Sequence, residues 1–143
     1  MVSQTSQYAL RAVLFLASTG GGPVVAQDIS DTTGVPKGYL HKILRRLGKA
    51  GILQAHRGVG GGYELVGKPS DLSVGQILKA IEPVHSAENG VGQNGDSSSQ
   101  SRPDALRRLL TAARKNLDTI FETTTVQDLL NDDMRALPAQ VSA

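Results

Sequence analysis

Basic side chains gather in one stretch of the 143-residue sequence, residues 37–68. Seven lysines and arginines stand there against Glu64 alone, a local charge of +6 in a chain whose total is +2. Such an excess is expected of a protein that binds a nucleic-acid backbone, because neutralised phosphates release counterions. The solvated face of an ordinary helix would carry similar charges, so the neighbouring pattern has to decide between the two readings.

The first part of this stretch follows a helical pattern. Apolar residues recur at the spacing of one helix face, which predicts a helix over residues 36–50 with that face inward. The apolar stripe comprises Leu40, Ile43, Leu44 and Leu47. The cations then lie on the opposite face. A recognition helix needs this arrangement, because its first turns enter the major groove while flanking cations meet phosphates.

A glycine-rich turn follows, between two stretches of strand character at residues 52–57 and 62–66, and predicts a β-hairpin wing. Four of the residues 58–62 are glycine, which leaves the backbone free to approach a sugar–phosphate chain. Arg57, at the root of the turn, is placed to enter the minor groove or to hold a phosphate. A nucleotide-binding loop is the competing interpretation, but neither a Lys-Ser or Lys-Thr pair nor a helix follows these glycines.

The preceding segments have to position this unit. Helical periodicity predicts a broadly apolar helix over residues 6–18 and a short helix over residues 26–32, with a short strand at Val24 and Val25 between them. Gly34 is a natural left-handed helix stop, and Pro36 suits the start of the next helix. The result is a helix-turn-helix. Downstream, Ser73 is predicted to cap a further helix that packs back on this unit and stops at Pro83.

The C-terminal part reads as a second functional unit. Residues 84–100 are rich in Gly, Ser, Asn and Gln and predict a mobile loop. Ser101 is predicted to cap a long helix that runs to about residue 121 and carries a heptad-spaced apolar seam, best used for pairing with a second copy. The expected dimerisation residues are Leu106, Leu109, Leu110, Ala113, Leu117, Ile120 and Phe121. A short element at residues 125–130 is expected to cover part of the seam, and the tail after residue 138 to fray.

Composition excludes several classes of function. The chain has no cysteine, so thiolate chemistry, disulfides and cysteine-ligated iron–sulfur clusters are excluded. The histidines lie in different predicted elements without ligand-like spacing, so no metal or other cofactor is expected. No apolar run is long enough for a membrane span, which favours a soluble cytoplasmic protein. No nucleophile elbow or paired carboxylates occur, so an enzyme is not expected.

These motifs resemble the Rrf2 family of bacterial winged-helix transcription regulators over most of the chain. The likeness rests on five stretches: Tyr8-Ala-Leu-Arg11; Gly38 to Leu44, with Leu47 and Lys49-Ala-Gly51; Arg57-Gly58; Gly61-Gly62-Tyr63 with Leu65; and Thr125 to Leu129. The resemblance implies a homodimer on a palindromic operator. Many members hold an iron–sulfur cluster through three cysteines near residues 84–100, and all three are missing here, so the controlling signal is left open between a small molecule and a protein.

The resemblance also implies which residues contact DNA. Bases and phosphates are expected near Lys37, Gly38, Tyr39, His41 and Lys42, and the turn from Arg57 to Gly61 is expected to reach the minor groove. His41 stands where the family often has glutamate. Because histidine can donate to guanine whereas glutamate accepts from cytosine, a different operator is implied. The complete set of predicted DNA-binding residues is Lys37, Gly38, Tyr39, His41, Lys42, Arg45, Arg46, Lys49, Arg57, Gly58, Gly60 and Gly61.

We therefore expect a mainly α protein with a small β-hairpin wing. The expected organisation has four parts. They are a winged helix-turn-helix domain over residues 1–83, a loop over 84–101, a dimerisation helix with a closing helix over 102–137 and a tail over 138–143. The expected function is that of a dimeric regulator, a repressor, on double-stranded DNA. The alternative is a winged-helix module that binds an acidic partner protein, whose copurification would resist nuclease.

Overall fold

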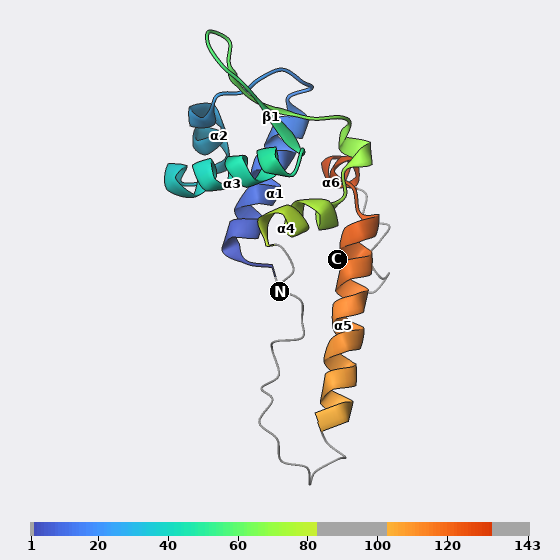
Figure 1. Cartoon of the computed structure of the whole chain (residues 1–143). Helices are drawn as coiled ribbons and strands as arrows, with labels where there is room; N and C mark the ends of the chain where they lie inside the picture. Colours follow the sequence, from blue (N-terminus) through green and yellow to red (C-terminus); the bar gives the residue numbers. More distant parts are fainter. Residues whose placement is uncertain (1, 83–102, 133–143) are drawn as a thin grey trace.

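The computed structural model describes residues 2–82 and 103–132. In chain order the elements are α1 (Gln4–Ser18), α2 (Ala26–Thr33), α3 (Lys37–Lys49), β1 (Leu53–His56), β2 (Gly62–Leu65), the 3-10 helix η1 (Pro69–Asp71), α4 (Val74–Ile81), α5 (Pro103–Thr123) and α6 (Val126–Leu130). The helices α1 to α4 and α6 form a cluster from which the hairpin projects at one end, while α5 extends away from the cluster as a single rod (Figure 1). The predicted fold class, mainly α with a hairpin wing and a long C-terminal helix, is confirmed.

The helix-turn-helix forms where the sequence predicts it. Gly34 ends α2 in the left-handed conformation, at φ 73°, and its N–H donates to the carbonyl of Ser30. Pro36 then caps α3, and its carbonyl accepts from the N–H groups of Tyr39 and Leu40 at 3.0 and 2.9 Å. The turn between the helices is therefore fixed by the backbone itself, which sets the direction of α3 relative to α2.

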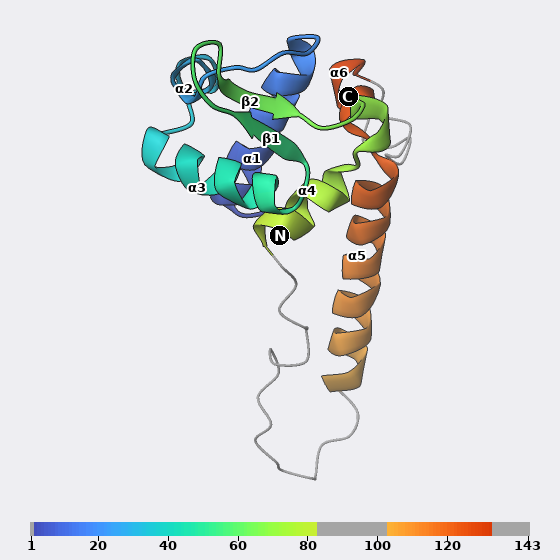
Figure 2. The same ribbon diagram turned by 45° about the horizontal axis from the view of Figure 1, so that its top comes forward.

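The wing is an antiparallel hairpin in which Leu53 pairs with Leu65 and His56 with Gly62. The expected short strand before α2 is reduced to a bridge, in which Val24 and Tyr63 exchange two backbone hydrogen bonds of 2.9 and 2.8 Å. The strand β2 thus gains a second neighbouring segment, from the connection between α1 and α2. Figure 2 shows this connection passing close to β2.

One core lies beneath α3. All four residues of the apolar stripe on α3 are fully buried, against Ala9, Ala12 and Val13 of α1 and Ile77 of α4. Ser73 caps α4 as predicted, in a capping box completed by Gln76. The α3 stripe is therefore the centre of the domain, which leaves the basic face of the same helix for contacts outside it.

The closing helix α6 packs differently from expectation. Instead of covering the seam of α5, α6 packs against α1 and η1, with Val126 fully buried in the core. Two backbone hydrogen bonds fix it there, from Val126 N–H to the carbonyl of Leu72 and from Val74 N–H to the carbonyl of Thr124. The chain after α5 thus returns to the winged-helix domain and anchors the end of α5 on it.

Several expectations lie outside the described residues: the loop at 84–101, the cap at Ser101 and the tail at 138–143. The division of the chain at residue 83 stays a prediction. Within residues 2–82 and 103–132, none of the helices combines the length and the apolar character that a membrane crossing requires.

Candidate nucleic-acid interface

The exposed face of α3 carries most of the predicted DNA-binding residues. Lys37, Gly38, Tyr39, His41, Lys42, Arg45, Arg46 and Lys49 are all exposed, on the side opposite the buried stripe. Figure 1 shows α3 at the edge of the helical cluster rather than within it. The helix therefore presents a continuous polar and cationic surface about thirteen residues long, rigidly backed by the core.

Arg46 stands apart from the other cations of this face. Its Nη1 donates to the backbone carbonyl of Ile81, at 2.8 Å, in the last turn of α4. This carbonyl belongs to a helix end and lacks an intrahelical partner, so the guanidinium serves as a cap that also complements the negative end of the helix dipole. Arg46 consequently joins the C-terminal half of α3 to the end of α4. Helical periodicity in the sequence did not predict this contact.

An aromatic pair supports the first turn of α3. Tyr39, which is half exposed, meets the ring of Tyr8 edge to face with centroids 5.7 Å apart. The guanidinium carbon of Arg11 lies 5.9 Å from the centre of the Tyr8 ring, and Gln4 Nε2 donates to the Tyr8 hydroxyl at 2.8 Å. These contacts restrict Tyr39 and place the charge of Arg11 near the start of α3.

The wing turn adopts conformations that require glycine. Gly58 and Gly60 have φ values of 88° and 76°. At Gly61 a Cβ atom would approach the carbonyl oxygen of His56 to 2.5 Å, and at Gly62 it would approach the backbone of Val24 to 2.5 Å. The glycines are thus needed to close the turn and to dock the hairpin, in addition to leaving its backbone accessible.

A hollow of about 540 Å³ lies between the wing and the start of α2. Val25 and Ala26 line one side, and residues 55–58 and 60–63 line the other. Arg57 is exposed there, and Val59 is fully exposed at the tip of the turn. The sequence interpretation singled out Arg57 and the glycines but not Val59, whose projecting side chain is recognisable only once the turn is formed.

Glu64 supplies the counter-charge on the wing. The hydrogen bond with His56, at 2.7 Å, is the largest influence that holds the pKa of Glu64 below its ordinary value of 4.5, and the backbone N–H of Gly22 adds to it. Partial desolvation opposes both effects. The carboxylate therefore remains ionised within a mostly cationic stretch.

The long helix α5 exposes the predicted seam. Leu106, Leu109 and Leu110 are 59–65% exposed and Leu117 is 42% exposed. Ala113 is also exposed, whereas Ile120 and Phe121 are partly buried near the winged domain. Part of this face, with Leu78 of α4, lines a hollow of about 640 Å³. The exposed leucines thus leave a row of apolar side chains on the projecting helix, a kind of surface that is often a site of interaction.

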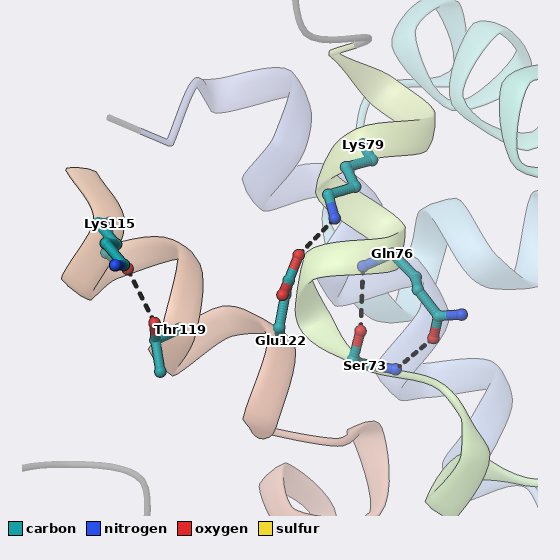
Figure 3. Close-up of polar contacts among 6 residues, drawn as sticks. All are labelled: Ser73, Gln76, Lys79, Lys115, Thr119 and Glu122. Carbon is teal, nitrogen blue, oxygen red and sulfur yellow. Dashed lines mark hydrogen bonds and ion pairs between the residues drawn. The ribbon is translucent and has the colours of Figure 1, made fainter. Parts of the chain in front are cut away.

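The junction of α5 with α4 is close. At Gly75 a Cβ atom would lie 3.1 Å from Cγ of Glu122, so the missing side chain lets the helices approach. Lys79 pairs with Glu122 across the same junction (Figure 3), and this hydrogen bond is the main cause that raises the pKa of Lys79 above its ordinary 10.5. On α5 itself, Thr119 donates to the carbonyl of Lys115 (Figure 3).

An exposed basic helix at the second position of a helix-turn-helix, followed by a glycine-rich hairpin, defines a winged helix-turn-helix regulator. The sequence model of the Rrf2 family, described as an iron-dependent transcriptional regulator, matches residues 2–132, and the chain belongs to this family. The family comprises transcriptional regulators rather than enzymes.

Relatives and solved structures agree with this assignment. The transcriptional regulator IscR of Cereibacter sphaeroides is 28% identical over 142 residues, which cover 96% of this chain and 92% of that protein. The structure of IscR from T. potens is similar at a TM-score of 0.75, with 28% identity over 98% of this chain and 93% of its own. CymR, the global cysteine regulator of B. subtilis, is similar at a TM-score of 0.76, with 26% identity over 92% and 97%.

The family description names iron, but this chain lacks the cysteine ligands of an iron–sulfur cluster. Without any cysteine, no thiolate is present to hold an iron–sulfur cluster. Among the described residues, moreover, no three His, Asp or Glu side chains are grouped so that they could hold a metal ion. The chain thus shares the fold of the iron-dependent regulators without the thiolate ligands of an iron–sulfur cluster.

Proposed function

We propose that this chain acts as a homodimer that binds a palindromic operator and represses transcription by occupying promoter DNA. The observation that carries the proposal is the division of α3, whose apolar stripe is fully buried while its cations lie on the opposite, exposed face. A helix with this division is backed rigidly enough to be inserted into a groove as a unit.

In this proposal α3 enters the major groove and the turn at residues 57–62 reaches the minor groove. His41 and Lys42 lie one to two turns into the helix, where side chains reach base edges, and His41 donates to guanine. Arg45 and Lys49 hold phosphates, and Arg57 enters the minor groove. Gly58, Gly60 and Gly61 let the turn backbone approach the sugars, since no side chains intervene.

Two winged domains are required because one α3 reads only a half-site. The leucines at positions 106, 109, 110 and 117, exposed on α5, provide the pairing surface, and pairing holds two copies of α3 at a fixed separation. The expected operator is therefore a palindrome about two helical turns long. The same leucines would otherwise present an apolar face to water along most of the helix.

Fluorescence anisotropy with the DNA upstream of the chain's own coding sequence tests the proposal. Binding should be tighter than to random duplex, by about a thousandfold or more, and should weaken steeply with salt because several phosphates are neutralised. Arg45→Ala and Arg57→Ala should each lose affinity while their circular dichroism spectra stay unchanged. Equal affinity for random duplex would refute sequence-specific binding, and full affinity in both variants would refute this surface.

Oligomeric state forms the second arm of the test. Sedimentation velocity should give a dimer, and an oligonucleotide with a single half-site should bind far more weakly than the full palindrome. Tight binding of one chain to one half-site would instead assign α5 to another partner.

A further inference from the structure

Glu64 is the one acidic residue of the basic stretch, and it lies on β2, in the wing that the proposed function brings to DNA. A carboxylate near phosphates opposes binding through repulsion. On electrostatic grounds alone, this position would be better filled by a neutral residue. The contacts of Glu64 supply a reason for its presence.

Donors from two separate segments converge on this carboxylate. Its Oε2 lies 2.7 Å from His56 Nε2 and 3.3 Å from Gln54 Nε2, both on β1. Its Oε1 accepts from the N–H of Gly22, at 3.3 Å, from a residue 42 positions earlier in the chain. Since Gln54 is the direct cross-strand partner of Glu64, and His56 lies two residues further along β1, the three side chains share one face of the hairpin.

The segment held by this contact is a run of three glycines, with no side chains to hold it. Gly20, Gly21 and Gly22 all have positive φ, and a Cβ added at any of them would meet nothing within 4 Å. The hydrogen bond to Gly22 joins these glycines to the wing two residues before Val24, which bridges to Tyr63. Glu64 therefore fastens the start of the connection to α2 onto the hairpin at a second point.

The other arm of the network reaches the root of the turn. His56 is the last residue of β1 and directly precedes Arg57. Its ring is 41% exposed and would be free to rotate without the carboxylate. Holding His56 restricts the backbone from which Arg57 projects, and an ordered donor loses less conformational entropy when it binds.

We propose that Glu64 is a positioning residue for DNA binding, which fixes the wing and Arg57 by joining His56, Gln54 and the Gly22 backbone. The inference rests on the proposed role of the wing in DNA binding. Glu64 itself does not contact DNA. It acts through Arg57, so removal of Glu64 lowers the affinity for DNA only where Arg57 is present.

Removal of the charge distinguishes the proposal by the sign of its effect. If Glu64 only adds negative charge near DNA, Glu64→Ala tightens binding. If it positions the wing, Glu64→Ala weakens operator binding by about fivefold, the range of one or two hydrogen bonds. Glu64→Gln, which keeps one acceptor oxygen, should recover part of the loss. Asp28→Asn is the matched control, because Asp28 is an exposed acid in the first turn of α2, outside the network of Glu64, and it should bind as well as wild type or better.

A double-mutant cycle with Arg57→Ala completes the test, with operator affinity measured at one salt concentration. The loss caused by Glu64→Ala should disappear in the Arg57→Ala background, and amide exchange at Gly22 should accelerate in Glu64→Ala. Unchanged or tighter binding by both Glu64 variants, or a fivefold loss that persists without Arg57, overturns the inference while leaving the proposed function intact. Failure of wild type to prefer the operator, or full affinity in Arg57→Ala, overturns the wing's proposed role and this inference with it.

Discussion

Substitution of Gly62 by alanine tests how closely the wing is docked onto the connection before α2. Gly62 has φ 140°, and a Cβ atom there would lie 2.5 Å from both the carbonyl carbon and the oxygen of Val24. These are backbone atoms, so no side-chain rotation relieves the overlap. The segment at Val24 has to move away, and its two hydrogen bonds with Tyr63, of 2.9 and 2.8 Å, have to lengthen or break.

The loss of stability in Gly62→Ala follows from the backbone strain and from the two hydrogen bonds. An L-residue held at such a φ costs about 1 kcal/mol, and the loss of two backbone hydrogen bonds adds about 2 kcal/mol, so Gly62→Ala should lower the free energy of unfolding by about 3 kcal/mol. Gly60→Ala is the matched control, because Gly60 also has positive φ, at 76°, but a Cβ there meets nothing within 4 Å. It should cost about 1 kcal/mol. The change in unfolded-chain entropy from glycine to alanine is common to both variants and cancels.

Urea denaturation monitored by circular dichroism, at one protein concentration for all variants, measures the difference. A gap of about 2 kcal/mol between the two variants is expected. Equal stabilities would refute the reasoning, since they would show that the wing does not press on Val24 in solution. Amide exchange at Tyr63 should also be faster in Gly62→Ala than in Gly60→Ala.

Three further predictions concern other parts of the chain. Leu110→Glu on α5 should convert the proposed dimer to a monomer in sedimentation velocity without loss of helicity, whereas a persisting dimer would place the interface elsewhere. Arg46→Ala should lower the free energy of unfolding by about 1.5 kcal/mol through loss of the charged hydrogen bond to Ile81, while Arg45→Ala should leave stability unchanged in the same urea titration. The lowered pKa of Glu64 means that its contribution to stability is present above pH 4.5 and is lost as the pH falls below it. The raised pKa of Lys79 gives a contribution that is present below pH 10.5 and lost as the pH rises above it. The urea midpoints of wild type and Glu64→Gln should therefore converge at low pH, and those of wild type and Lys79→Met at high pH.

Helical periodicity was sufficient to predict most of the fold. The helices predicted over residues 26–32 and 36–50 correspond to α2 and α3 within one residue at each end, because Gly34 and Pro36 leave the chain little choice of turn. Ser73 was identified as a cap for a similar reason, since its side chain bonds to the N–H three residues later. Features that are fixed by residues close in the sequence could therefore be predicted from the sequence.

Contacts between segments that are distant in the sequence could not be predicted from periodicity. A periodic pattern tells which face of a helix is apolar, but not which element covers it, so α6 was expected on the seam of α5 although it packs on α1 and η1. Arg46 was predicted only as a DNA-binding cation, and Glu64 was counted only as a charge. Their partners, the Ile81 carbonyl and the Gly22 N–H, are 35 and 42 positions away and are brought near by the tertiary fold.

These long-range contacts attach the two parts of the proposed DNA-binding surface to different supports. Through Arg46, α3 is joined to the end of α4, and α4 meets α5 at Gly75 and at the pair between Lys79 and Glu122. The wing is joined instead to the connection after α1, through Val24 and Glu64. In a dimer paired through α5, a rotation at the α4 junction would therefore move α3 more directly than the wing. The spacing between the two proposed major-groove contacts would then depend on that junction, whereas the placement of Arg57 would depend on the anchoring of the wing.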